Sequence, residues 1–127
     1  MGQQVLLDTT VLIAGLSEND IHHREAREIF MENGQSRLTI SSVTLTEALI
    51  RPFTLGKVQG ERAEITIRAL IRKIIPFTDE HAALAAKIRS THKAKIPDSM
   101  IIATAVLEGI RLITFDRKMM GLYERIK

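Results

Sequence analysis

The chain has 127 residues, of which 45% are hydrophobic and 26% charged, a balance typical of one globular domain. It contains no cysteine, which excludes disulfides, thiolate metal ligands and a cysteine nucleophile, and its formal net charge of +3 is mildly basic. The N-terminal segment has no signal-peptide pattern, and no apolar run approaches the roughly 20 residues of a membrane span. We therefore expect one cytoplasmic domain over residues 1–127, without membrane contact.

Short apolar runs alternate with amphipathic segments along the chain. Strands are expected at residues 5–7, 37–41, 74–77 and 111–115. Helices are expected at residues 9–16, 22–32, 44–50, 61–74, 80–91 and 97–108. Pro52 is expected to end the third helix, Gly109 to end the last, and Pro76 to place its strand at a sheet edge. This alternation predicts an α/β fold with a parallel sheet covered by helices on both faces.

Four acidic residues lie where this sheet would bind a ligand. Asp8 directly follows the first strand, and Asp116 directly follows the last. Glu47 lies within about two helical turns of the second strand, and Asp98 lies in the first turn of its helix. Ligands of open parallel sheets bind outside the carboxyl ends of the strands, so all four acids are expected at one edge.

Each of these acids also has a purely structural explanation. The alternatives are a helix cap for Asp8, a capping box with Thr44 for Glu47, a helix-start position for Asp98, and a turn with local ion pairs for Asp116. Taken together, however, the acids would repel one another, by on the order of 4 kcal/mol for a pair about 4 Å apart at an effective dielectric of 20. A cation would relieve this repulsion, and oxygen ligands favour Mg²⁺ or Mn²⁺. Such an ion can activate water for phosphodiester hydrolysis.

Four sequence blocks connect the chain to a known family. They are LLDTTVLI at 6–13, ISSVTLTEAL at 40–49, IPDSMIIATA at 96–105 and LITFDR at 112–117. In this order and spacing, the chain resembles PIN-domain ribonucleases, and most closely the VapC-type toxins of prokaryotic toxin–antitoxin pairs. The resemblance covers nearly the whole chain. It implies a PIN-like α/β fold with a short central parallel sheet of about four to five strands, and a Mg²⁺- or Mn²⁺-dependent endonuclease that hydrolyses RNA.

The resemblance also implies roles for individual residues. Asp8, Glu47, Asp98 and Asp116 match the family's acidic metal-binding quartet, with Asp8 and Asp98 as the main direct ligands. Glu47 and Asp116 would bind through water or a second ion and help to deprotonate the attacking water. Thr114 matches a hydroxyl that orients the last acid or its water. Thr9 would do similar work or simply start its helix.

A basic segment precedes Asp98. Lys87, Arg89, Lys93 and Lys95 occur there without an intervening acid. This pattern is typical of a solvated helix face, or of a surface that binds phosphates in a salt-dependent way. Given the resemblance, we expect Arg89, Lys93, Lys95 and Arg117 to hold RNA phosphates around the acidic site.

The segment at residues 61–75 is apolar on more than one face. Its Ile65, Ile67, Leu70, Ile71 and Ile74 fit either a central core helix or an interface. Given the resemblance, we expect a two-fold homodimer that uses part of this surface. We also expect a cognate antitoxin to dock in a nearby groove and place a basic side chain against the acids.

Other functions are less consistent with the residues. A phosphatase of the haloacid-dehalogenase type needs a second aspartate where Thr10 stands, and a receiver domain needs an acid near Leu55, where there is none. The remaining alternative is a non-catalytic RNA-binding or protein-interaction module. Stacking aromatics among basic residues would indicate such a module, but the chain has only four Phe and one Tyr.

Overall fold

The computed structural model describes residues 3–127, apart from the side chain of residue 35. Its four strands form one parallel sheet in the order β3-β2-β1-β4: β1 (Val5–Leu7), β2 (Leu38–Ser41), β3 (Lys73–Ile75) and β4 (Arg111–Ile113). The helices are α1 (Thr9–Leu16), α2 (His23–Asn33), α3 (Ser42–Leu55), α4 (Lys57–Leu70), α5 (Asp79–His92), α6 (Ile96–Glu108) and α7 (Arg117–Ile126). A short 3₁₀ turn, Gln35–Arg37, precedes β2. The predicted α/β fold is confirmed.

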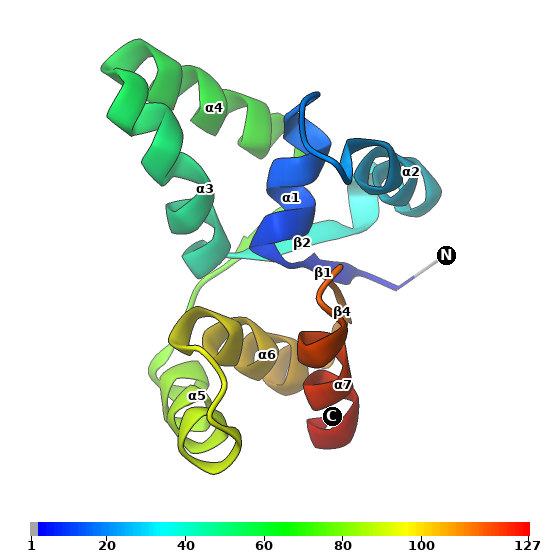
Figure 1. Ribbon diagram of the computed structural model, residues 1–127, viewed down its shortest axis with the longest axis vertical. Helices are drawn as coiled ribbons and strands as arrows, with labels where there is room; N and C mark the ends of the chain where they lie inside the picture. Colours follow the sequence, from blue (N-terminus) through cyan, green and yellow to red (C-terminus); the bar gives the residue numbers. More distant parts are fainter. Residues whose placement is uncertain (1–2) are drawn as a thin grey trace.

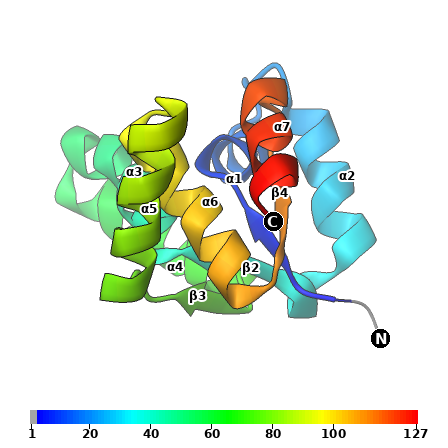
Figure 2. The ribbon, with the colours of Figure 1, turned by 90° about the horizontal axis from the view of Figure 1, so that it is seen from below.

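The sheet divides the molecule into two helical layers. Helices α1 to α4 lie on one side of it and α5 to α7 on the other, as Figures 1 and 2 show. Strand β1 serves both layers, because successive side chains of a strand point to opposite faces. Val5 and Leu7 join the core beneath α1 to α4, whereas Leu6 joins the core beneath α5 to α7. No helix in the described residues is long and apolar enough to cross a membrane.

The middle of the chain departs from the sequence-based expectation. Helix α3 continues through Pro52 to Leu55, so the prediction that proline ends it was wrong. The last turn of α3 packs on α4, where a Cβ added to Gly60 would overlap the ring of Phe53. This contact between the two helices retains a turn that proline alone would disfavour. The α4 helix ends at Leu70, and the residues assigned to its C-terminal turn lead into β3 instead.

The C-terminal segment forms an element that we did not predict. Strand β4 ends at Ile113 rather than at residue 115, and α7 begins directly after Asp116. Met119, Leu122 and Tyr123 are the buried residues of α7, at the three- and four-residue spacing of an amphipathic helix. Strand β3 lies at the sheet edge, as Pro76 led us to expect. Helix α7 forms the C-terminal wall of the site described next.

Candidate metal centre

The Asp8 carboxylate lies at the centre of a hydrogen-bond network. Its side chain is 4% exposed; one oxygen accepts from the Thr9 backbone N–H at 2.8 Å, so Asp8 caps α1. The other oxygen accepts from the hydroxyls of Thr10 and Thr114, each at 2.8 Å. The Asp8 backbone N–H donates to the Ile113 carbonyl of β4 at 2.9 Å. The helix-cap alternative is therefore correct, and it coexists with a position at the carboxyl edge of the sheet.

Glu47 reaches the same place from α3. Its carboxylate accepts a 2.6 Å hydrogen bond from the Thr9 hydroxyl, which also lies 3.0 Å from the hydroxyl of buried Thr44. Because α3 begins at Ser42 and is capped by Ser41, Thr44 is not a helix cap, and the capping-box alternative for Glu47 is wrong. The Thr9 hydroxyl instead holds Glu47 next to Asp8.

Asp98 lies in the first turn of α6, as expected, but Lys95 occupies the capping position. No hydrogen bond engages its carboxylate within the described part of the chain. Burial raises the pKa of Asp98, and the charges of Asp8, Asp116 and Glu47 raise it further, while Lys95 opposes them. The three other predicted acids therefore lie close enough to Asp98 for their charges to act on it.

Asp116 and Thr114 complete the edge. One Asp116 oxygen accepts from the backbone N–H groups of Lys118 and Met119, at 2.9 and 3.1 Å, so Asp116 caps α7. Its carboxylate makes no ion pair with the described basic residues, so the ion-pair alternative is wrong. The Thr114 hydroxyl accepts from the Asp116 N–H at 3.1 Å and donates to Asp8. Thr114 therefore links the first of the four site acids to the last.

The donor chemistry of this edge fits a hard divalent cation. Its side-chain donors are carboxylate and hydroxyl oxygens, which suit Mg²⁺ or Mn²⁺ better than zinc. Burial is the largest cause of the raised pKa of Asp98, and the negative charge of the three other acids adds to it, as expected for a cluster without a cation. In the described residues, no three acidic or histidine side chains already surround a single point closely enough to hold an ion. The acids converge without forming a closed cage.

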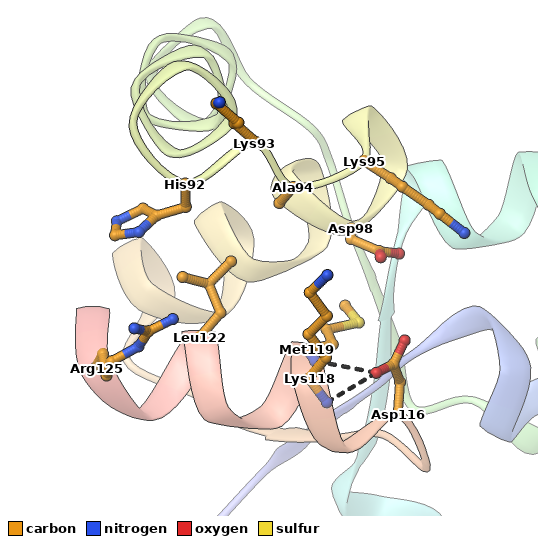
Figure 3. A pocket seen from close by; sticks show the side chains of 10 residues that line it. All are labelled: His92, Lys93, Ala94, Lys95, Asp98, Asp116, Lys118, Met119, Leu122 and Arg125. Atoms are coloured by element: carbon orange, nitrogen blue, oxygen red, sulfur yellow. Dashed lines mark hydrogen bonds between the residues drawn. The ribbon is translucent and has the colours of Figure 1, made fainter.

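A hollow of about 340 Å³ adjoins two of the acids (Figure 3). Lys93 and Lys95 lie in its lining together with Asp98 and Asp116, whereas Arg89 and Arg117 do not. The Arg89 guanidinium donates a 2.6 Å hydrogen bond to the Ala94 carbonyl, so it holds the α5–α6 loop.

Two cations that sequence reasoning missed also line this hollow. They are Lys118 and Arg125, and both belong to α7. Recognising Asp116 as a helix cap followed by an amphipathic pattern would have identified α7 and these residues.

Comparison with known proteins agrees with the fold. The family model "PIN domain" matches residues 5–124, and the chain therefore belongs to the PIN domain family. Ribonuclease VapC38 of Mycobacterium tuberculosis is 26% identical, over 87% of this chain and 84% of the relative.

Two solved structures resemble the whole fold. A toxin–antitoxin complex from Klebsiella pneumoniae has a chain with a TM-score of 0.75 and 28% identity, covering 91% of this chain and 88% of the other. The structure of FitAB bound to an IR36 DNA fragment has a TM-score of 0.80 and 26% identity, covering 95% and 91%.

Replacement of Asp98 by asparagine tests whether the carboxylate of Asp98 is repelled by the other three acids. A carboxyl group whose pKa is raised by folding destabilises the native state once it is ionised, that is, as the pH rises through its native pKa. Asp98→Asn should therefore unfold at a higher denaturant concentration than the wild type at neutral pH in the absence of metal. The difference should shrink below pH 3.8, the ordinary carboxyl value, where both proteins are uncharged at this position. Glu18→Gln, at an exposed residue, is the control. A less stable Asp98→Asn at neutral pH would instead indicate an ordinary helix-start acid.

Replacement of Thr9 by valine tests how Glu47 is held. Valine keeps the shape of threonine but removes the donor to the Glu47 carboxylate, so the free energy of unfolding should fall by about 1–3 kcal/mol. The increase in melting temperature caused by Mn²⁺ should also be smaller, because Glu47 is no longer held in place. Thr9→Ser keeps the hydroxyl and should retain most of the metal response. Equal metal responses in Val, Ser and wild type would exclude this role for Thr9.

Proposed function

We propose that the chain is a Mg²⁺- or Mn²⁺-dependent ribonuclease and the toxin of a toxin–antitoxin pair, acting in the cytoplasm. The observation that carries this proposal is the gathering of acids at the carboxyl edge of the sheet, where Thr114 holds Asp8 and Thr9 holds Glu47. After burial, the charges of the three other acids also raise the pKa of Asp98. The named relatives support it: one is a ribonuclease, and another belongs to a toxin–antitoxin complex.

The proposed chemistry follows from the donors of the site. A bound divalent ion lowers the pKa of water and neutralises charge on a phosphate. Asp8 and Asp98 are assigned as the direct ligands. Glu47 and Asp116 would bind through water and accept its proton. Thr114 keeps Asp8 in one orientation through its 2.8 Å hydrogen bond, and Thr9 does the same for Glu47 at 2.6 Å.

These threonines favour an enzyme over a non-catalytic module on the same fold. A binding module gains nothing from collecting four carboxylates at one edge, since like charges repel each other and also repel RNA. Two of the carboxylates are nevertheless held there by threonine side chains from α1 and the β4–α7 loop.

Cleavage assays with asparagine variants test the proposal. Wild-type protein should cleave a pool of labelled RNAs in Mn²⁺ or Mg²⁺ but not in EDTA, and the ion should raise its melting temperature by binding only the native state. Asp8→Asn and Asp98→Asn should lose cleavage by orders of magnitude and show a smaller thermal shift, since each lacks a direct ligand. Glu18→Gln should behave as the wild type. Full cleavage by Asp98→Asn, or a wild type indifferent to metal, would refute the assignment.

This chain has a groove beside the acids that would suit an antitoxin. This groove, of about 430 Å³, lies between α1, α3 and α4, and Glu47 and Arg51 are part of its lining. Its apolar lining residues are Ile13, Leu16, Ala48, Pro52, Leu55, Ala63 and Ile67. An apolar groove of this kind suits an amphipathic helical segment. A basic side chain of such a segment would reach Glu47 and neutralise part of the cluster.

A two-fold homodimer would use the α3–α4 hairpin. Of the apolar residues that suggested an interface, Ile67 and Ile71 are buried in the core, whereas Ile65 is 70% exposed. Leu55 and Val58, at the tip of the hairpin, are 67% and 55% exposed. Of the residues that suggested the interface, only Ile65 is exposed, and Leu55 and Val58 extend that apolar surface beyond the predicted segment.

Sedimentation tests the dimer. Wild-type protein at tens of micromolar should sediment as a dimer, and Ile65→Glu as a monomer, because a buried unpaired charge disfavours association. Ile21→Glu, at a residue that is 90% exposed and belongs to the segment between α1 and α2 rather than to the hairpin, should remain dimeric. A monomeric wild type, or a dimer that Ile65→Glu leaves intact, would contradict this interface.

A further inference from the structure

The hollow beside Asp98 and Asp116 is acidic at one end and basic at the other. Its acidic end belongs to the candidate metal centre, and its far end is formed by His92 and Arg125 (Figure 3). Its basic residues are His92, Lys93, Lys95, Lys118 and Arg125, and its apolar residues are Ala94, Met119 and Leu122. Among the described residues, no ion pair engages its lysine and arginine side chains. These charges are therefore available to an anionic ligand.

One face of α7 carries a cation, an apolar residue and a second cation in succession. Lys118, Leu122 and Arg125 are spaced four and three residues apart, which places them on one side of a helix. Figure 3 shows all three beside the hollow, with Lys118 toward the acids and Arg125 at the opposite end. The two cations are seven positions apart in the sequence, which is about 10 Å along the helix axis. A nucleotide within an RNA strand presents the matching groups: two phosphates joined by a ribose, and an apolar base face that branches from that ribose.

The loop between α5 and α6 forms the wall of the hollow opposite α7, and hydrogen bonds hold this loop in one conformation. Lys93 adopts a left-handed backbone conformation (φ 56°), which is uncommon for a residue with a side chain. Its N–H donates to the Arg89 carbonyl at 2.9 Å, and the Arg89 guanidinium donates to the Ala94 carbonyl at 2.6 Å. Both hydrogen bonds fix the loop between α5 and α6. A loop that is ordered before binding reduces the entropy that a ligand must overcome.

We propose that this hollow is a subsite for the nucleotide that adjoins the scissile phosphate of a single-stranded RNA. Lys118 lies beside the scissile phosphate, Arg125 and His92 hold the neighbouring phosphate, and the base rests on Leu122 and Ala94. The strand must be unpaired, because a base inside a duplex could not reach the apolar floor. This subsite rests on the proposed ribonuclease function, and it specifies on which side of the acids the strand continues.

Nuclear magnetic resonance titration of the full chain in EDTA tests the subsite without relying on cleavage. The probes are uridine 5′-monophosphate, adenosine 5′-monophosphate and inorganic phosphate. Both nucleotides should shift the methyl signals of Met119 and Leu122 and the amide signals around Lys118. Inorganic phosphate should shift the amides but not the methyls. Methyl shifts of equal size with phosphate alone, or nucleotide shifts confined to another surface, would overturn the proposal.

Charge-neutral variants of exposed residues provide the second test. Arg125→Gln and Lys118→Gln should each weaken nucleotide binding by about three- to tenfold, the loss expected for one charged contact. Arg62→Gln, at an exposed α4 residue outside the hollow, should bind nucleotides as the wild type does. Unchanged affinity in both α7 variants would overturn the subsite.

Measurements of RNA cleavage distinguish the proposed subsite from the ribonuclease function on which it rests. Arg125→Gln should raise KM and leave kcat nearly unchanged, because it removes binding that is equal in the ground and transition states. A chain that cleaves RNA but shows no nucleotide shifts in the hollow would refute the subsite alone. A chain that binds nucleotides there but cleaves no RNA would refute the ribonuclease function, and the hollow would remain a nucleotide-binding site without a scissile phosphate.

Discussion

Electrostatic repulsion between four carboxylates at one sheet edge is the constraint around which this molecule is organised. Parallel strands bring Asp8 and Asp116 to that edge, the second turn of α3 brings Glu47 there, and the first turn of α6 brings Asp98. Nothing in the apolar cores requires these charges to meet. The cost of the meeting is visible at Asp98, whose pKa rises through burial and through the three other acids. A fold that maintains such a cluster has use for a cation.

The four acids are held to different degrees. Asp8 accepts from two hydroxyls and one backbone N–H, Glu47 accepts from one hydroxyl, and Asp116 accepts from two backbone N–H groups. Asp98 alone among them has no such partner in the described structure. Because three of the carboxylates are held by hydrogen bonds and Asp98 is not, a small rotation of the Asp98 side chain would be enough for the site to bind an ion. This asymmetry also explains why the acids converge without forming a closed cage.

The sequence predicted the features that depend on local pattern, and it failed where tertiary packing decided. Strand β1, the helix after it and the glycine that ends α6 follow from short-range rules, and the structure confirms them. The path of α3 through Pro52 does not, because it depends on the close approach of Phe53 to Gly60 in the next helix. The positions of Asp8, Glu47, Asp98 and Asp116 followed from their places after strands and at helix starts. The threonine hydrogen bonds between Thr9 and Glu47, and between Thr114 and Asp8, join residues distant in sequence and could not be derived from spacing.

Asp116 serves both as the cap of α7 and as one of the four acids of the site, and these two roles are compatible. Asp116 uses one carboxylate oxygen to cap α7, and that bond fixes where the helix begins. The same bond therefore sets the positions of Lys118, Leu122 and Arg125 relative to the acids. A helix N-terminus also favours negative charge, so capping partly offsets the repulsion that Asp116 experiences from its neighbours. The residue that we first considered either a turn acid or a metal ligand thus couples the acidic edge to the basic surface beside it.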